Sequence, residues 1–248
     1  MSDNTLKKID RFQFSLKDSI GIGSFGQVYK GKEEKTHRPV AVKMISKQKI
    51  QKDEYLMNGL FSEIQVMKKL KSEYVVELIE VLETSNNYYI IQELCDSGDL
   101  RHILKKKKNL SEQEALQVLK DLLSGFTELL KNGIIHRDLK PENILCAKGK
   151  FKLADFGFAR AVENFNRAVL ESLVGTPLYM SPQILKHETY GTKSDIWSLA
   201  LIYYEMLIGS TPWKARSQYE LVKKIDSEKI TFPDNIIISQ EIQRKIQL

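Results

Sequence analysis

Hydrophobic and polar positions alternate over short runs in the first part of the chain, and this period of two is typical of β-strands. The runs are rich in Val, Ile, Tyr and Phe, are separated by turn-forming residues, and predict strands at residues 12–21, 26–34, 40–46, 75–83 and 87–94. Among them, residues 53–72 place apolar side chains every three to four positions, which predicts an amphipathic helix. The first part of the chain is therefore expected to form a strand-rich unit with one helix.

The period lengthens to that of helices after Asp96–Gly98. Ser111 and Glu114 have the spacing of a capping box, and the helix that they open is expected to end at Gly133. Because Asp96–Gly98 is short and turn-prone, we expect a hinge there between a strand-rich lobe, residues 1–95, and a helical lobe, residues 96–248. The expected fold class is α+β.

Composition narrows the class of protein further. A chain of 248 residues with 42% hydrophobic residues can form a folded core, and its net charge of +6 comes from scattered lysines, so we expect no nucleic-acid partner. Its two cysteines, Cys95 and Cys146, are too few for a disulfide framework and favour a reducing compartment. The longest apolar stretch, residues 196–208, is shorter than a membrane span and contains Glu205. We expect a cytoplasmic protein with no membrane span.

A glycine-rich stretch, "GIGSFGQV", places Gly21, Gly23 and Gly26 in G-x-G-x-x-G order. Glycines let backbone N–H groups approach a polyphosphate without obstruction by side chains. In a dinucleotide-binding unit the third glycine would open a helix, whereas here a strand follows. The order favours a hairpin whose turn folds over phosphates, and a flexible turn without a ligand is the alternative.

A lysine, Lys43, interrupts the apolar strand "PVAVKMI" and needs an anion there. Glu63 follows 20 residues later on the predicted helix, and an ion pair would hold the ammonium group within reach of phosphate oxygens. Alternatively, both residues are ordinary surface charges.

Two further loops present polar side chains between apolar anchors. In "IIHRDLKPENIL", Asp138 can accept or orient the proton of an attacking hydroxyl, Lys140 can neutralise a transferring phosphoryl group, and Asn143 can offer an oxygen to a hard cation. In "LADFGFAR", Asp155 follows a predicted strand, and with Asn143 it predicts a magnesium site. The alternative is that Asp138 and Asp155 only cap turns.

In order, "GIGSFGQV", "VAVK", Glu63, "HRDLKPEN", "DFG", "GTPLYMSPQ" and "SDIWSLA" resemble the eukaryotic protein kinase family, and the match runs from about Phe12 to the end of the chain. The resemblance implies a bilobal kinase fold that binds ATP and Mg²⁺. It implies that a glycine loop covers the ATP phosphates, namely Gly21, Ile22, Gly23, Ser24, Phe25 and Gly26. Lys43 would contact the phosphates while paired with Glu63, Asp138 would be the catalytic base, and Asn143 and Asp155 would hold the metal.

The same resemblance assigns an adenosine pocket. It implies that Val28, Ala41 and Leu145 sandwich adenine, that Gln92 is the gatekeeper, that Glu93 and Cys95 are hinge residues, and that Asp99 contacts the ribose. Each apolar position could equally be ordinary core packing, and Gln92 could be a strand-end residue that points at water.

Features of the substrate side are also implied by the resemblance. Lys140 and Thr176 are typical of kinases that phosphorylate Ser or Thr of protein substrates, and Glu142 resembles a position that meets an arginine in members with basic substrates. Ser172 matches the position at which an upstream kinase phosphorylates related enzymes, and its phosphate would pair with Arg137.

The resemblance departs from the family near the end of the chain. Gln183 replaces a glutamate that usually pairs with a distant arginine, and the sequence ends at Leu248, so we expect a C-terminally truncated kinase. The stretches "CDSGDL" and "GTPLYMSPQIL" look most like the autophagy-initiating kinases, with calcium/calmodulin-type kinases as the second choice. A pseudokinase scaffold that binds nucleotide without transferring phosphate is the alternative function.

Overall fold

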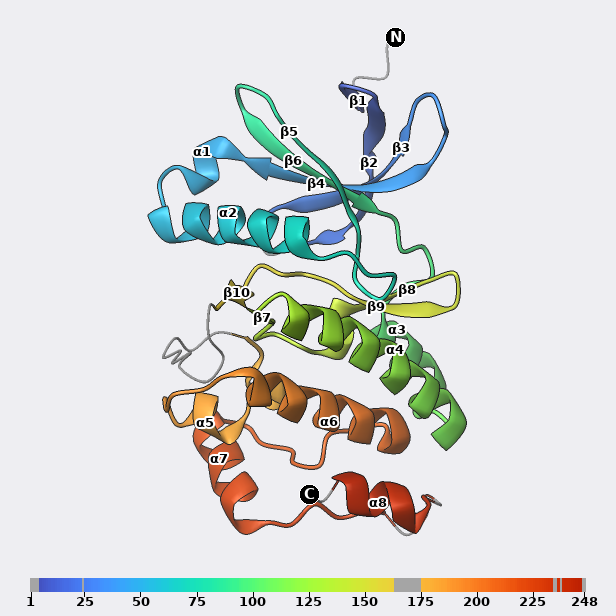
Figure 1. The fold of residues 1–248 in the computed structure, drawn as a ribbon, viewed down its shortest axis with the longest axis vertical. Helices are drawn as coiled ribbons and strands as arrows, with labels where there is room; N and C mark the ends of the chain where they lie inside the picture. Colours follow the sequence, from blue (N-terminus) through green and yellow to red (C-terminus); the bar gives the residue numbers. More distant parts are fainter. Residues whose placement is uncertain (1–4, 24, 163–174, 234–235, 237, 247–248) are drawn as a thin grey trace.

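The structure, a computed structural model, describes residues 5–23, 25–162, 175–233, 236 and 238–246 (Figure 1). Its first part is a six-stranded sheet with two helices. The strands are β1 (Leu6–Ile9), β2 (Phe12–Ile22), β3 (Gln27–Glu33), β4 (Pro39–Ser46), β5 (Leu78–Glu83) and β6 (Asn87–Glu93), and the helices are α1 (Lys47–Ile50) and α2 (Glu54–Lys69).

The sheet has the order β1-β2-β3-β4-β6-β5, and all neighbouring strands are antiparallel. The strands predicted by the alternating pattern are confirmed as β2 to β6, whereas β1 was not predicted. Successive side chains of a strand point to opposite faces, so Ile91 joins Val42 in one cluster while its neighbour Ile90 joins Ile45 in another. The second face receives α2.

Helix α2 lies against one face of the sheet (Figure 1). It begins after Asp53, whose side chain accepts a hydrogen bond from Leu56 N, and its apolar residues Leu60 and Ile64 pack in the cluster that contains Ile45. The predicted amphipathic helix is therefore confirmed, with its polar side facing outward.

The second part of the chain is mainly helical (Figure 1). Its helices are α3 (Leu100–Lys107), α4 (Glu112–Lys131), α5 (Pro182–Leu185), α6 (Thr192–Ile208), α7 (Gln218–Ser227) and α8 (Gln240–Ile246). Its short strands and 3₁₀ turns are β7 (Ile134–Ile135), η1 (Pro141–Asn143), β8 (Ile144–Ala147), β9 (Lys150–Leu153), β10 (Arg160–Ala161) and η2 (Pro177–Tyr179). Ser111 and Glu114 form the predicted capping box of α4.

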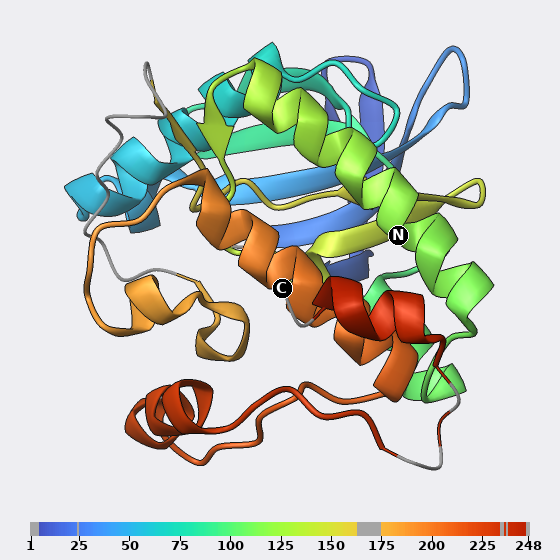
Figure 2. The same cartoon turned by 60° about the horizontal axis from the view of Figure 1, so that its bottom comes forward.

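Helix α6 forms the centre of the helical part. It is apolar on nearly all sides and largely buried, and α4 and α8 lie beside it (Figure 2). None of the helices in the described part of the chain is both long and apolar enough to cross a membrane. A strand-rich lobe and a helical lobe thus confirm the α+β class. Asp96–Gly98 lie in the connection between β6 and α3. A hinge there and a boundary between residues 95 and 96 stay predictions.

Candidate active site

A cavity of about 510 Å³ lies where the sheet meets the helical part, a size suited to a nucleotide. Most of the predicted ligand-binding residues line it, namely Gly21, Ile22, Gly23, Val28, Ala41, Lys43, Glu63, Gln92, Glu93, Cys95, Asp99, Asn143, Leu145 and Asp155. Of the other predicted residues, Phe25, Gly26, Asp138 and Lys140 do not line it, and Ser24 lies outside the described residues. An apolar cavity of about 830 Å³ between α4, α6 and α8 is larger, but it contains none of the predicted residues.

The cavity has eight further lining residues, Ile20, Lys30, Val76, Leu94, Asp96, Gly98, Glu142 and Ala154. The sequence singled out Glu142 only for the substrate side and Asp96–Gly98 only as a hinge, and it did not single out the other five. Val76 lies within the strand predicted at residues 75–83, and Ala154 directly precedes Asp155. Both are buried apolar residues, so their sequence signal is that of ordinary core positions. Only their placement in the fold brings them to the cavity.

Lys43 and Glu63 form the predicted ion pair. Lys43 Nζ donates to Glu63 Oε1 at 2.8 Å, and the two residues are 4% and 1% exposed, so they are not ordinary surface charges. The pair joins β4 to α2. Glu63 Oε2 is buried and has no hydrogen-bond partner among the residues that the structure describes. The buried ion pair holds α2 against the sheet, and Glu63 Oε2 can accept a further hydrogen bond at the cavity wall.

Burial and charge oppose each other at this pair. Burial lowers the pKa of Lys43, but the charges of Glu63 and Asp155 outweigh it, so the pKa of Lys43 is raised overall. Burial raises the pKa of Glu63, and the charge of Lys43 works against that rise. Since two carboxylates surround the lysine, its ammonium form is the stable one, and that form can bind phosphate oxygens.

The glycine-rich turn approaches Lys43 closely. A Cβ atom on Gly23 would lie 2.8 Å from Lys43 Cε, and one on Gly26 would lie 2.1 Å from the backbone oxygen of Met44. Gly23 N donates to the carbonyl oxygen of Gly26 at 2.8 Å, which closes the turn. Glycine is therefore required at position 26, where the clash would be with the backbone, whereas a side chain at position 23 would displace the end of the Lys43 side chain.

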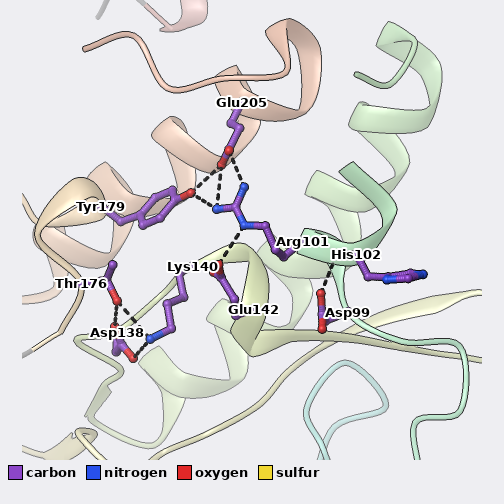
Figure 3. A network of polar contacts seen from close by, with 9 residues as sticks. All are labelled: Asp99, Arg101, His102, Asp138, Lys140, Glu142, Thr176, Tyr179 and Glu205. Atoms are coloured by element: carbon purple, nitrogen blue, oxygen red, sulfur yellow. Dashed lines mark hydrogen bonds and ion pairs between the residues drawn. The ribbon is translucent and has the colours of Figure 1, made fainter. Parts of the chain in front are cut away.

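Asp138 is 5% exposed and accepts hydrogen bonds from three side chains. Lys140 Nζ lies 2.7 Å from Oδ2, and Thr176 Oγ1 donates to Oδ1 at 3.0 Å (Figure 3). Asn143 Nδ2 donates to Oδ2 at 3.0 Å and to the Asp138 carbonyl at 2.9 Å. Lys140 also donates to Thr176 Oγ1 at 3.0 Å. These contacts fix the carboxylate in one orientation, which goes beyond capping a turn.

The backbone before Asp138 is held by Asp195 of α6. Asp195 Oδ2 accepts from His136 N at 2.8 Å, and Oδ1 accepts from Arg137 N at 2.9 Å. Burial raises the pKa of Asp195, and the charges and N–H groups of His136 and Arg137 oppose that rise. The Arg137 backbone has φ of 71°, a left-handed conformation that costs energy. The two hydrogen bonds from His136 N and Arg137 N to Asp195 hold the backbone in it.

Asp155 and Asn143 are brought to the same wall of the cavity. Ala154 N donates to the Asn143 carbonyl at 2.9 Å, which ties the two loops together next to both side chains. Asp155 has φ of 58°, and Gly157 N lies 3.4 Å from its Oδ1. A carboxylate and an amide oxygen are hard donors of the kind that Mg²⁺ accepts alongside phosphate oxygens, so these two residues fit a divalent cation.

The residues predicted for adenosine also line the cavity. Ala41 and Gln92 are partners in the β4–β6 register, and Leu145 forms an isolated bridge with Asp99. Gln92 Nε2 donates to Met67 Sδ at 3.2 Å, so the side chain points at α2 rather than at water. Asp99 caps α3 by accepting from the next turn. Its role toward a ribose stays a prediction.

The hinge residues carry different chemistry. Glu93 binds Lys152 Nζ through both oxygens, at 2.6 and 2.8 Å, which ties the end of β6 to β9. Burial, with the charge of Glu93, raises the pKa of the Cys95 thiol to about 12. Cys95 is therefore a neutral thiol at the cavity rim.

A two-lobed fold whose cleft is lined by a buried Lys–Glu pair and a glycine turn, with an oriented aspartate beside it, defines the protein kinase class. The protein kinase domain family matches residues 14–247, and the chain belongs to this family.

Several curated serine/threonine-protein kinases are similar to the chain. TIO of Arabidopsis thaliana is 40% identical over 219 residues, which cover 88% of this chain and 16% of that protein. The atg1 kinase of Dictyostelium discoideum is 36% identical over 231 residues, covering 90% of this chain and 34% of that protein, and ULK1 of Homo sapiens is 36% identical over 236 residues, covering 91% and 22%. The chain thus spans between 16% and 34% of the length of these relatives. They support the predicted resemblance to the autophagy-initiating kinase group.

Proposed function

We propose that this chain is a serine/threonine protein kinase that transfers the γ-phosphate of ATP to hydroxyl groups of protein substrates. The observation that carries the proposal is Asp138, a buried carboxylate oriented by Lys140, Thr176 and Asn143 beside a nucleotide-sized cavity. Positioning and electrostatics supply most of the catalysis in phosphoryl transfer, and this arrangement offers both.

Lys43 and the glycine turn are the proposed phosphate-binding groups. The buried Glu63 keeps the Lys43 ammonium group in place, and the turn leaves room for phosphates because Gly23 has no side chain. Val28, Ala41 and Leu145 line the cavity where we place adenine, with Gln92, Glu93 and Cys95 at its edge and Asp99 near the ribose.

Asn143 and Asp155 are the proposed ligands of Mg²⁺. When bound there, the ion would neutralise charge on phosphate oxygens. Both residues line the cavity, and Asn143 Nδ2 donates to Asp138, which leaves the Asn143 side-chain oxygen for the cation.

Asp138 is the proposed catalytic base. Its carboxylate would accept or orient the proton of the substrate hydroxyl, while Lys140, 2.7 Å away, would stabilise negative charge on the transferring group. The Lys140–Thr176 contact of 3.0 Å connects this site to η2. The family resemblance associates these two residues with Ser and Thr, rather than Tyr, as acceptor.

Phosphorylation of Ser172 by an upstream kinase is the proposed regulation. Ser172 lies outside the described residues. Its proposed partner, Arg137, donates to the Phe158 carbonyl at 2.5 Å and to the Tyr190 hydroxyl at 3.3 Å. A phosphate on Ser172 that pairs with Arg137 would order the segment that carries it. Ser172→Ala is expected to lower turnover several-fold. If complete dephosphorylation leaves the turnover of the wild type unchanged, this role is contradicted.

A cytoplasmic location without nucleic-acid partners is also proposed. Cys95 and Cys146 are both free thiols, as expected in a reducing compartment, and the positive charges are scattered along the chain.

The proposed activity is tested by incubating the protein with labelled ATP and degenerate peptides that carry Ser, Thr or Tyr as the sole acceptor. Magnesium-dependent labelling of the Ser and Thr peptides, abolished by a chelator, is the expected result. Nucleotide binding without transfer to any acceptor would instead support the pseudokinase scaffold.

A further inference from the structure

Arg101 of α3 is held by two carboxylates from different parts of the fold (Figure 3). Its Nε donates to Glu142 Oε1 at 2.8 Å, and its Nη1 donates to Glu205 Oε1 at 2.6 Å. Its Nη2 donates to the Tyr179 hydroxyl, which in turn donates to Glu205 Oε2 at 2.6 Å. One guanidinium group therefore donates hydrogen bonds to side chains of three elements, α6, η1 and η2.

The arginine replaces a cation that these carboxylates would otherwise need. The Glu205 side chain is only 7% exposed, and a buried carboxylate requires a partner. Burial lowers the pKa of Arg101, but its hydrogen bonds to Glu205 and Glu142 outweigh this effect and raise the pKa overall. Burial and the contact with Glu205 raise the pKa of Tyr179, so its hydroxyl stays neutral. Within the cluster, Arg101 is the charged partner of the buried Glu205 and also pairs with the exposed Glu142.

The cluster lies where a protein substrate must pass. Glu142 follows the proposed base Asp138 by four residues, in η1, and its side chain is 46% exposed. Tyr179 ends η2, whose preceding residue Thr176 donates directly to Asp138. A peptide whose hydroxyl reaches Asp138 would therefore run alongside the carboxylate of Glu142 (Figure 3).

We propose that Arg101 is a specificity-determining residue that fills, from within the chain, a subsite in which a substrate's basic side chain would otherwise pair with Glu142 and Glu205. The inference rests on the proposed kinase function. It replaces the expectation, based on Glu142 alone, of a substrate with a basic residue near the acceptor. Substrates with neutral residues at that position are predicted to bind as well as those with Arg.

A purely structural role, in which Arg101 only pins α3 to α6, makes a different prediction. It predicts a loss of stability in Arg101 variants without a change in peptide preference. Arg101→Met keeps the length of the aliphatic stem and removes the charge, so it separates the two roles better than alanine does. Lys107→Ala is the matched control, because Lys107 is on the same helix and pairs with the exposed Glu114.

The test uses peptides in which alanine replaces the acceptor. For each position that flanks the acceptor, one peptide carries Arg and its partner carries Gln, and fluorescence anisotropy measures the binding of both. The wild type and Lys107→Ala should bind the two peptides alike. Arg101→Met should bind the Arg peptide roughly tenfold more tightly at one position, the effect of a charge-assisted hydrogen bond. Adding Glu142→Gln to Arg101→Met should remove the gain.

Equal binding of the two peptides by folded Arg101→Met would overturn the inference. If Arg101→Met does not fold, the binding of the two peptides to the wild type is the test. A marked preference of the wild type for the Arg peptide would show that the subsite is open and would overturn the inference. Absence of phosphate transfer to the corresponding Ser peptides, with the binding pattern as predicted, would contradict only the proposed kinase function.

Discussion

Thr176 Oγ1 donates a hydrogen bond of 3.0 Å to Asp138 Oδ1, across 38 positions of sequence. The contact joins η2, on the proposed substrate side, to the loop that carries the proposed base. Asp195 fixes the backbone of that same loop from α6. The orientation of Asp138 therefore depends on two segments that lie well beyond it in the sequence.

The first prediction concerns this hydroxyl. Thr176→Ala should lower kcat about tenfold or more, because Asp138 and Lys140 each lose a contact that positions them. Thr176→Ser keeps the hydroxyl and should restore most of the rate. KM for ATP should change little, since Thr176 does not line the cavity. Equal rates for the Ala and Ser variants in steady-state assays would argue against a positioning role.

The second prediction concerns the buried ion pair. Glu63→Gln removes one partner and leaves Lys43 buried next to Asp155 alone, so the free energy of unfolding should fall by about 3–5 kcal/mol. Affinity for ATP should fall as well. The control, Glu77→Gln, breaks the exposed pair with Arg38 and should change little. Urea unfolding measures the free energy of unfolding of the two variants, and equal losses of stability in them would contradict the account.

The third prediction concerns two glycines of the same turn. Gly26→Ala should destabilise the protein by about 1–3 kcal/mol, because the new methyl group would meet the Met44 carbonyl at 2.1 Å. Gly21→Ala should leave the melting temperature nearly unchanged, since a Cβ there has no neighbour within 4 Å. Thermal melts of the two variants side by side check the difference. A greater loss in Gly21→Ala would show that the turn is built differently.

The fourth prediction follows from the raised pKa of Cys95, about 12. Only the thiolate reacts with alkylating reagents, so in a Cys146→Ser background the alkylation rate should be low at pH 7 and rise roughly tenfold per pH unit without levelling off by pH 10. Denaturation should accelerate it strongly. Mass spectrometry of iodoacetamide labelling provides the measurement, and a plateau near pH 9 would mean that burial does not suppress ionisation.

The local period of the sequence predicted the elements well where a single face is buried. Strands β2 to β6 and helices α2 and α4 follow directly from alternation, from three-to-four spacing and from the capping box at Ser111. Strand β1 is only four residues long, and its half-exposed pattern carries little signal without its partner β2. Short strands at the edge of a sheet are defined by pairing rather than by propensity.

The residues around the cavity could be singled out from the sequence, but not all of their contacts could. Lys43, Glu63, Asn143 and Asp155 stand in an ordered set of motifs, and the fold brings them to one cavity with Asp138 beside it. Their roles stay predictions. The contact of Gln92 with Met67 and the contact of Arg101 with Glu205 join positions 25 and 104 residues apart. Such pairs leave no local pattern in a single sequence, because packing of distant elements creates them.

The most direct test of the account compares the wild type with Asp138→Asn for both ATP affinity and phosphate transfer to Ser peptides. The amide keeps the shape of the side chain but cannot accept the proton, so transfer should fall by about 10²–10⁴-fold while ATP affinity stays close to that of the wild type. Equal transfer by the two proteins would contradict the claim that the carboxylate held by Lys140, Thr176 and Asn143 is the catalytic base.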